Sequence, residues 1–404
     1  MNNFMIGCNY WASHAGIEMW KNWSAKTIRG DLKALSQCGV EYLRVFPLWR
    51  DFQPVKSQYS WANKLRGYVM GEDERDLENN PDAIDPVMIE RFRTFAKIAD
   101  EFNMKLIVSV VTGWMSGRMF VPPALEGKNL LTDYEVLMWT GKFIRGFVTR
   151  TKDIENIVMW DLGNECNCMQ VVNTRQEAYT WLMFCRNAIY SADSSRKIAS
   201  GMHSLEISGV WRLDDHGEIC DVLTTHPYPL PGSKCEDEPV NRMKPTIIPT
   251  IQSEWYSALS RKPCMIQEQG SFATSRGNEQ IEADFLRVNM ISAWANNLTG
   301  YLWWCAHEQL NLNTAPYTWN TGERELGILN PDREPKIAGK EMRRMGDVIR
   351  KLPDIENKCI DAVCIPCYSD KFGAAAGCAV LAKQAGFNVS FADNEKELPV
   401  SQCY

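Results

Sequence analysis

Short apolar runs alternate along this chain with longer stretches in which apolar residues recur every three or four positions. The short runs predict β-strands and the longer stretches predict amphipathic helices. Because helices separate the strands, we expect an α/β fold of the closed parallel (β/α)8, or TIM-barrel, type. No glycine-rich phosphate turn follows the first strand, which argues against an open dinucleotide-binding sheet. The expected strands cover Phe4–Asn9, Val40–Phe46, Lys105–Val111, Asn156–Asp161, Lys197–Met202, Cys220–Thr225, Pro263–Gln267 and Gly300–Trp304.

Local end signals indicate where several helices begin. Ser24 is expected to cap one helix, and Pro86 is expected to open another at its first position. Thr132 and Glu135 have the spacing of a capping box for a third helix. Further helical stretches are expected over Thr174–Ser191, Thr250–Ser260, Glu279–Asn296 and Ile337–Leu352.

Two connections, Pro54–Ile84 and His307–Glu334, are much longer than the others. Both follow strands, so both belong to the end of the barrel where active sites of such barrels lie. Long loops in compact domains are commonly lids or pocket walls. We therefore expect both connections to shape a binding site.

The pattern changes after Pro353. A strand over Asp361–Pro366, an alanine-rich helix over Gly373–Ala385 and a strand over Phe387–Ala392 predict one βαβ unit. The chain is thus expected to comprise a barrel of residues 1–353 and a small C-terminal module of residues 354–404. Because a single βαβ unit cannot bury both of its faces, it is expected to dock on the barrel or on a neighbouring subunit.

Composition and charge exclude several classes of function. Of the 404 residues, 23% are charged, and the net charge at pH 7 is −6. This acidic balance argues against a nucleic-acid partner. No apolar run is long enough to span a membrane. The N-terminus lacks the basic and apolar segments of a signal peptide, so a cytoplasmic location is expected.

The possible metal ligands do not form a recognisable set. The fourteen cysteines are expected to be free thiols, because no secretory signal accompanies them. Cys364 and Cys367 form a CxxC pair, but no second pair stands at zinc-ribbon spacing. The five histidines are scattered, which argues against a metal-dependent barrel hydrolase. Neither a metal nor a cofactor is expected.

The first candidate for catalysis is Glu165, which follows an apolar strand in the segment Trp160–Glu165. A glutamate at the barrel mouth can protonate a leaving group where its surroundings raise its pKa. The neighbouring Asn164 can form a hydrogen bond with a sugar hydroxyl. An isolated Asn-Glu pair would more simply be a helix cap followed by a surface glutamate, so a catalytic role requires a partner.

Glu268 is that partner, because it ends the seventh apolar strand in the segment Lys262–Gly270. Strands four and seven face each other across the mouth of a barrel, so Glu165 and Glu268 can flank one bond. A pair of carboxyl groups is the usual equipment for hydrolysing a glycoside, and retaining enzymes hold the two about 5–5.5 Å apart.

Further polar residues lie at the ends of other predicted strands. Tyr228, after the sixth strand, can donate a hydrogen bond to the nucleophilic carboxylate. His226 can hold a substrate hydroxyl or the acid/base. Arg44 lies on an otherwise apolar strand, and burying its charge requires a carboxylate partner. Glu268 is the natural candidate for that partner.

Aromatic residues are abundant, with fifteen Trp, thirteen Tyr and fifteen Phe. Flat rings can pack against the apolar face of a sugar, although many of these rings are expected to fill the core. Trp303 and Trp304 end the eighth strand, and strand alternation should point one of them into the layer between barrel and helices. We favour Trp303 as the sugar platform.

With these residues in place, the barrel resembles glycoside hydrolase family 5, in the group whose acid/base and nucleophile lie on strands four and seven. The resemblance covers about residues 4–352 and implies net retention through a covalent glycosyl-enzyme on Glu268, with Glu165 as general acid/base. Many members carry a histidine after the third strand, whereas Trp114 stands there in this chain, which affects the expected contacts to sugar hydroxyls. The residues that carry the resemblance are Arg44, Asn164, Glu165, His226, Tyr228, Glu268, Trp303 and Trp304.

The tail resembles the start of the flavodoxin-like second domain of some β-galactosidases, which helps to form trimers, so the resemblance implies a homo-oligomer. Barrel and tail together are similar to the exo-β-mannosidases of subfamily 18. This implies a small oligosaccharide substrate, such as the mannose-β-1,4-N-acetylglucosamine unit of N-glycan cores, and a pocket closed by Pro54–Ile84. The alternatives are an endo-acting β-mannanase or β-glucanase of the same family and an inactive carbohydrate-binding barrel.

Overall fold

The computed structural model describes residues 3–229, 238–271, 277–319, 321–353, 355, 358–367 and 370–393. Eight parallel strands lie in the order β10-β11-β12-β1-β2-β5-β8-β9. The two end strands are joined by a parallel bridge between Ala199 and Val222, so the sheet closes. The predicted (β/α)8 barrel is confirmed. Its strands are β1 (Met5–Asn9), β2 (Tyr42–Val45), β5 (Lys105–Val111), β8 (Ile157–Gly163), β9 (Lys197–Ala199), β10 (Leu223–Thr225), β11 (Cys264–Gln269) and β12 (Gly300–Trp303).

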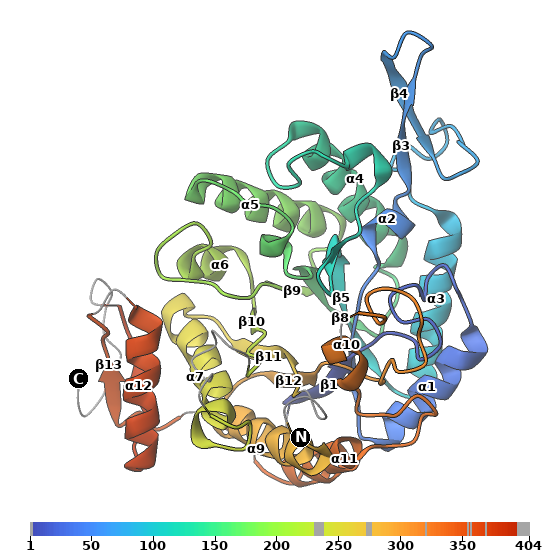
Figure 1. The fold of residues 1–404 in the computed structure, drawn as a ribbon. Helices are drawn as coiled ribbons and strands as arrows, with labels where there is room; N and C mark the ends of the chain where they lie inside the picture. The colour runs from blue at the N-terminus through green and yellow to red at the C-terminus, as the bar shows by residue number, and fades with distance from the viewer. Residues whose placement is uncertain are drawn as a thin grey trace.

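Helices surround the strands on the outside (Figure 1). Ser24 caps the first of them, as predicted, and Pro86 occupies the first position of another. None of the described helices combines the length and apolar character needed to cross a membrane. The helices of the barrel are α1 (Ala25–Gln37), α3 (Pro86–Glu101), α4 (Tyr134–Thr151), α5 (Arg175–Ala192), α6 (Leu213–Ile219), α7 (Met243–Ser260), α9 (Glu279–Ala295) and α11 (Ile337–Ile349).

Three details of the helices differ from the prediction. Asp133, and not Thr132, caps α4, because the Asp133 carboxylate accepts the backbone N–H groups of Glu135 and Val136. The short helix α6 was not expected. Helix α7 begins at Met243, earlier than predicted, and contains an internal proline that weakens its sequence signal.

The two long connections have different structures. The first contains α2 (Trp49–Phe52) at its start and then the antiparallel hairpin β3 (Val55–Tyr59) and β4 (Leu65–Met70), which projects away from the barrel (Figure 1). The second contains the short helix α10 (Thr321–Glu325) at the barrel mouth. A small hairpin, β6 (Trp114–Met115) and β7 (Arg118–Met119), follows the third barrel strand.

The C-terminal module docks on helix α7 of the barrel (Figure 1). It consists of β13 (Ala362–Cys364), α12 (Lys371–Gln384) and β14 (Val389–Phe391), and its two strands are parallel, as the predicted βαβ unit requires. The Trp255 ring of α7 contacts Phe372 and Phe391 at centroid distances of 6.1 and 5.3 Å. Of the two expected partners, the barrel and a neighbouring subunit, the unit thus contacts the barrel.

Candidate active site

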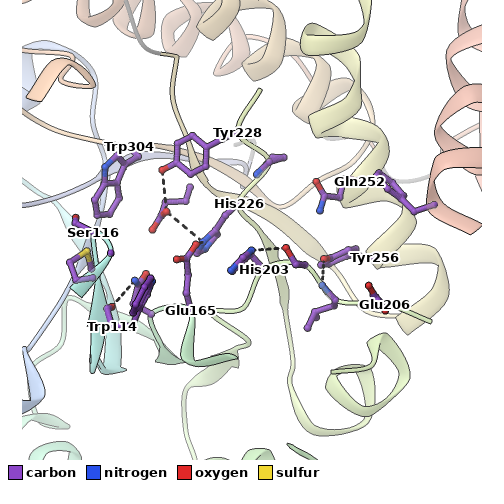
Figure 2. A pocket seen from close by; sticks show the side chains of 18 of the residues that line it. Trp114, Ser116, Glu165, His203, Glu206, His226, Tyr228, Gln252, Tyr256 and Trp304 are labelled. Carbon is purple, nitrogen blue, oxygen red and sulfur yellow. Dashed lines mark hydrogen bonds and ion pairs between the residues drawn. The ribbon is translucent and has the colours of Figure 1, made fainter. Parts of the chain in front are cut away.

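A cavity of about 890 Å³ opens at the carboxyl ends of the barrel strands. Glu165 and Glu268 both line it, together with most of the residues singled out in the sequence (Figure 2). No residue of the projecting hairpin segment 54–84 is among its lining residues, so the expectation that this connection closes the pocket is wrong. The lining residues that the sequence analysis named are Trp114, Asn164, Glu165, His226, Tyr228, Glu268 and Trp304.

The backbone turns sharply where β8 ends, and this turn presents Glu165 to the cavity. Glu165 has a left-handed conformation with φ 44°, which is strained for a residue other than glycine. Its N–H donates to the carbonyl of Gly201 at 2.8 Å, and its own carbonyl accepts the N–H of Cys168 at 2.7 Å. These bonds hold the strained conformation at the residue that the sequence assigns to acid/base chemistry.

Asn164 lies beside Glu165 and is almost completely buried. Its Nδ2 donates to the carbonyl of Trp114 at 3.0 Å. Its Oδ1 has no hydrogen-bond partner among the described residues, although it is buried. A buried polar atom without a partner is costly, so Asn164 is placed to bind a polar group that enters the cavity.

A β-bulge in β11 places Glu268 in the cavity. The pairing of β11 with β12 shifts register between Ile266 and Gln269, and such a bulge re-aims side chains near the end of a strand. As a result Gln267 and Glu268, which are neighbours in sequence, both reach groups at the barrel mouth: Gln267 Nε2 donates to Asp161 at 3.2 Å, and Glu268 Oε1 accepts from Arg44.

Arg44 is completely buried between two carboxylates. Its Nη1 donates to Glu268 Oε1 and its Nε donates to Asp161 Oδ2, both at 2.8 Å. The predicted contact with Glu268 is therefore present. The contact with Asp161 was missed, although an aspartate inside an apolar strand was a sign of a buried partner. Ser109 completes the network by accepting from Arg44 and donating to Asp161.

His226 connects Glu165 to this network (Figure 2). Its Nδ1 lies 2.7 Å from Glu165 Oε1, and its Nε2 lies 3.2 Å from Gln267 Oε1. Since the Gln267 amide nitrogen donates to Asp161, its oxygen is left as an acceptor, so Nε2 of His226 carries a hydrogen. Nδ1 is then the atom that shares a proton with Glu165. On the opposite carboxylate, the Tyr228 hydroxyl donates to Glu268 Oε2 at 3.1 Å.

The charges in this cluster determine where its protons reside. Burial by itself would raise the pKa of Glu165, but the hydrogen bond and charge of His226 lower it to about 2. Burial would lower the pKa of His226, but the charges of Glu268 and Glu165 raise it above its usual value. Burial raises the pKa of Glu268, and Arg44 and Tyr228 oppose this by stabilising the carboxylate. The Glu165–His226 pair therefore stores one proton beside Glu268.

The two tryptophans at the end of β12 point to opposite sides, as strand alternation requires. Trp303 is completely buried between barrel and helices, where it contacts Phe285 of α9. Trp304 lines the cavity (Figure 2). Trp303, which the sequence analysis favoured as the sugar platform, therefore does not line the cavity, whereas Trp304 does.

Glu323 of α10 is a further carboxyl group in the cavity, and the sequence analysis did not identify it. Its Oε2 accepts a hydrogen bond from Trp304 Nε1 at 3.3 Å. Burial raises its pKa to about 7, and the charges of Glu268 and Glu165 act in the same direction. Nothing in its local sequence distinguishes it, because it reaches the cavity only through the folding of a long loop.

Two groups of described residues have ligand atoms close enough to bind a metal ion, each group within 4.8 Å. One consists of Glu165, Cys168 and His203, in which Cys168 Sγ lies 2.9 Å from His203 Nε2. The other is the cluster of Glu165, His226 and Glu268. Both contain Glu165, so a cation in either group would occupy the candidate acid/base.

Solved structures with a similar fold exist, whereas searches with the sequence alone find no match. The sequence matches no family model and no curated protein. The fold is similar to that of a Glu-to-Ala variant of GH5_18 from Streptomyces cattleya in complex with Manb1-4GlcNAc, with a TM-score of 0.81 and 20% identity over 97% of this chain and 94% of that chain. It is also similar to the exo-beta-1,4-mannosidase Op5Man5 from Opitutaceae bacterium strain TAV5, with a TM-score of 0.80 and 22% identity over 98% and 70% of the two chains.

A more distant likeness is to the endo-beta-1,4-mannanase from Thermotoga petrophila, with a TM-score of 0.64 and 14% identity over 90% of this chain and 82% of that chain. At these identities the likeness establishes architecture only. The GH5_18 structures match along nearly the whole chain, C-terminal module included. The chain therefore has the barrel-and-tail fold of the GH5_18 structures.

Proposed function

We propose that this protein is a retaining exo-β-mannosidase that releases a terminal β-linked mannose from small oligosaccharides. The observation that carries the proposal is the arrangement of the two glutamates. A carboxylate oxygen of each lies within 4.8 Å of the other and of His226 Nδ1, which is close enough for one carboxylate to attack the carbon whose leaving group the other protonates.

The proposed reaction has two displacements. In the first, a Glu268 oxygen bonds to the anomeric carbon while the bond from that carbon to the leaving oxygen breaks. The leaving oxygen takes a proton from Glu165, and His226 Nδ1 supplies that proton to Glu165 across their contact of 2.7 Å. In the second, Glu165 removes a proton from water, the water oxygen bonds to the anomeric carbon, and the ester bond to Glu268 breaks. Two inversions give net retention.

The surrounding residues have distinct parts in this scheme. Arg44 and Tyr228 hold the Glu268 carboxylate in place through hydrogen bonds to different oxygens. His226 stores a proton beside Glu165 at a contact of 2.7 Å. The proton that the leaving group needs is therefore available without delivery from solvent.

The choice of a terminal mannose rests on the shape of the cavity and on the neighbours. Trp304 offers a ring surface for a sugar beside Glu268, and Ser116 and Glu323 line the same end of the cavity. Because these residues form a wall at that end of the cavity, they favour a single terminal sugar over a polymer that passes through the site. The neighbour from Streptomyces cattleya, in complex with Manb1-4GlcNAc, and the exo-beta-1,4-mannosidase from the Opitutaceae bacterium support a β-mannoside.

Turnover of nitrophenyl β-mannoside, β-glucoside and β-galactoside, measured side by side, tests the proposal. We expect a clear preference for the mannoside, β-mannose as the first product by NMR, and no early loss of viscosity from mannan. Rapid viscosity loss without aryl-mannoside turnover would indicate an endo-acting mannanase. Sugar binding without any hydrolysis would indicate a carbohydrate-binding barrel.

A further inference from the structure

The cavity extends well beyond the two glutamates. In Figure 2, Trp304 and Ser116 lie on one side of Glu165, whereas Gln252 and Tyr256 of α7 lie on the other. In the proposed reaction Glu165 protonates the leaving oxygen, so the side beyond Glu165 and away from Trp304 receives the leaving group. This half was not identified from the sequence.

Part of the wall of this half comes from the C-terminal module. Asp370 and Phe372, at the start of α12, line the same cavity as Glu165. The Phe372 ring lies 6.1 Å from the Trp255 ring of α7, which also lines the cavity. An aromatic surface from the module is thus continuous with one from the barrel, beside the polar side chains of Gln252 and Glu206.

The module is fixed to the barrel by charged and aromatic contacts. Glu254, buried on α7, forms ion pairs with Lys358 and with Lys383, the latter at 3.7 Å. Lys383 Nζ also donates to Asn296 Oδ1 at 3.0 Å. Because Lys358 precedes β13 and Lys383 lies in the last turn of α12, these contacts fix two separate parts of the module, and so the position of Phe372 at the cavity.

We propose that the C-terminal module forms part of the binding site for the leaving sugar, with Phe372 packing against a face of that sugar ring. The inference rests on the proposed function and deepens it. Rings that stack on a pyranose face and polar groups that meet its hydroxyls are the two kinds of surface that a hexose site needs. The module would then select short leaving groups, because it closes the side of the cavity toward which a longer chain would extend.

Replacing Phe372 by alanine tests this role through the leaving group. With Manb1-4GlcNAc as substrate, we expect F372A to raise KM about tenfold, because one aromatic contact of this kind is lost. With β-mannosyl fluoride, whose leaving group occupies no sugar site, the rate should stay within about twofold of wild type. The matched control is F387A, since Phe387 is an exposed aromatic residue of the same module and does not line the cavity.

Binding without turnover separates this inference from the proposed function. Saturation-transfer NMR with N-acetylglucosamine should show binding to wild type and F387A and a clear loss with F372A. If wild type hydrolyses no mannoside, the proposed function fails, and the NMR comparison still decides the role of the module. The inference is overturned if F372A binds the sugar as wild type does, or if F372A loses equal activity on both mannosyl substrates.

Discussion

The two ends of the barrel interior are built from the same strands but with opposite chemistry. Near the amino ends of the strands the interior is apolar, and further along the strands it is polar and buried. Because side chains two residues apart lie on the same face of a strand, one strand can contribute to both layers, as β5, β8 and β11 do. The apolar layer contains Met5, Ile107, Met159, Ala199, Val222, Met265 and Leu302. The polar layer contains Asn9, Arg44, Ser109, Asp161 and Gln267, all completely buried.

The difference separates stability from chemistry along the barrel axis. Burying methionine and leucine side chains stabilises the fold by about 1.5–3 kcal/mol each. Burying Arg44 between Asp161 and Glu268 has a desolvation penalty that the ion pairs offset only in part. The polar layer therefore serves to position other groups. Arg44 holds the Glu268 carboxylate, and Gln267 holds the ring of His226.

The largest effect on activity is expected at Glu268, at the mouth. The variant E268Q keeps the shape of the side chain but removes the nucleophile, so kcat should fall by at least about 10³-fold. The melting temperature and circular dichroism spectrum should stay close to those of wild type. Near-wild-type turnover of a nitrophenyl glycoside by E268Q would refute the assignment of the nucleophile.

Glu165→Ala should have an effect that depends on the leaving group. With a sugar leaving group, the loss of the general acid should lower kcat/KM by about 10²–10⁴-fold. With a dinitrophenyl leaving group, which departs without protonation, the first step should be nearly unaffected and a burst of released phenol should be visible. Equal losses on both substrates would contradict its role as the acid.

The apolar layer should show the opposite behaviour. Met159 is buried two residues before Asp161 on β8, so M159A creates a cavity and should lower the free energy of unfolding by about 2–5 kcal/mol. Urea denaturation measures this change. At a temperature where M159A is folded, its kcat/KM should stay within about twofold of wild type. A loss of activity as large as that of E165A would show that the two layers are not separable.

Much of this molecule could be predicted from local sequence patterns. The strand Lys105–Val111 coincides with β5, and the two glutamates were identifiable because each follows an apolar strand. The errors arose where two neighbouring residues are equally suited by type to the same structural role. Thr132 and Asp133 are both good helix caps, and strand alternation separates Trp303 from Trp304 without saying which of the two faces the cavity.

Other residues of the site could not be predicted, because tertiary packing alone brings them to the cavity. Glu323 is brought to the cavity by a long loop, and Phe372 belongs to a module more than a hundred residues after Glu268. Neither position has a periodic pattern or a motif around it. The docking of the C-terminal module on α7 is what brings Phe372 to the cavity that Glu165 and Glu268 line.

The smallest expected effect concerns Glu323, a carboxyl group of the mouth whose charge is disfavoured in the folded protein. Its pKa is raised from the ordinary 4.5 to about 7, so between these pH values the folded state binds more protons than the unfolded state. Its contribution to the free energy of unfolding should therefore fall as the pH rises from about 4.5 to 7 and stay level above. Because one pKa unit corresponds to about 1.4 kcal/mol, this shift limits the change to about 3 kcal/mol.

The variant E323Q should remove that part of the pH dependence, measured by urea denaturation at pH values across this range. E282Q is a useful comparison, because Glu282 is a buried carboxyl group outside the cavity whose pKa is raised to about 8. It should flatten the stability profile up to a higher pH while leaving the pH dependence of KM unchanged. E323Q should alter both profiles, since Glu323 meets Trp304 at the surface proposed to bind the sugar. If E323Q leaves both profiles as in wild type, Glu323 does not titrate in this range and belongs with the structural residues of the barrel.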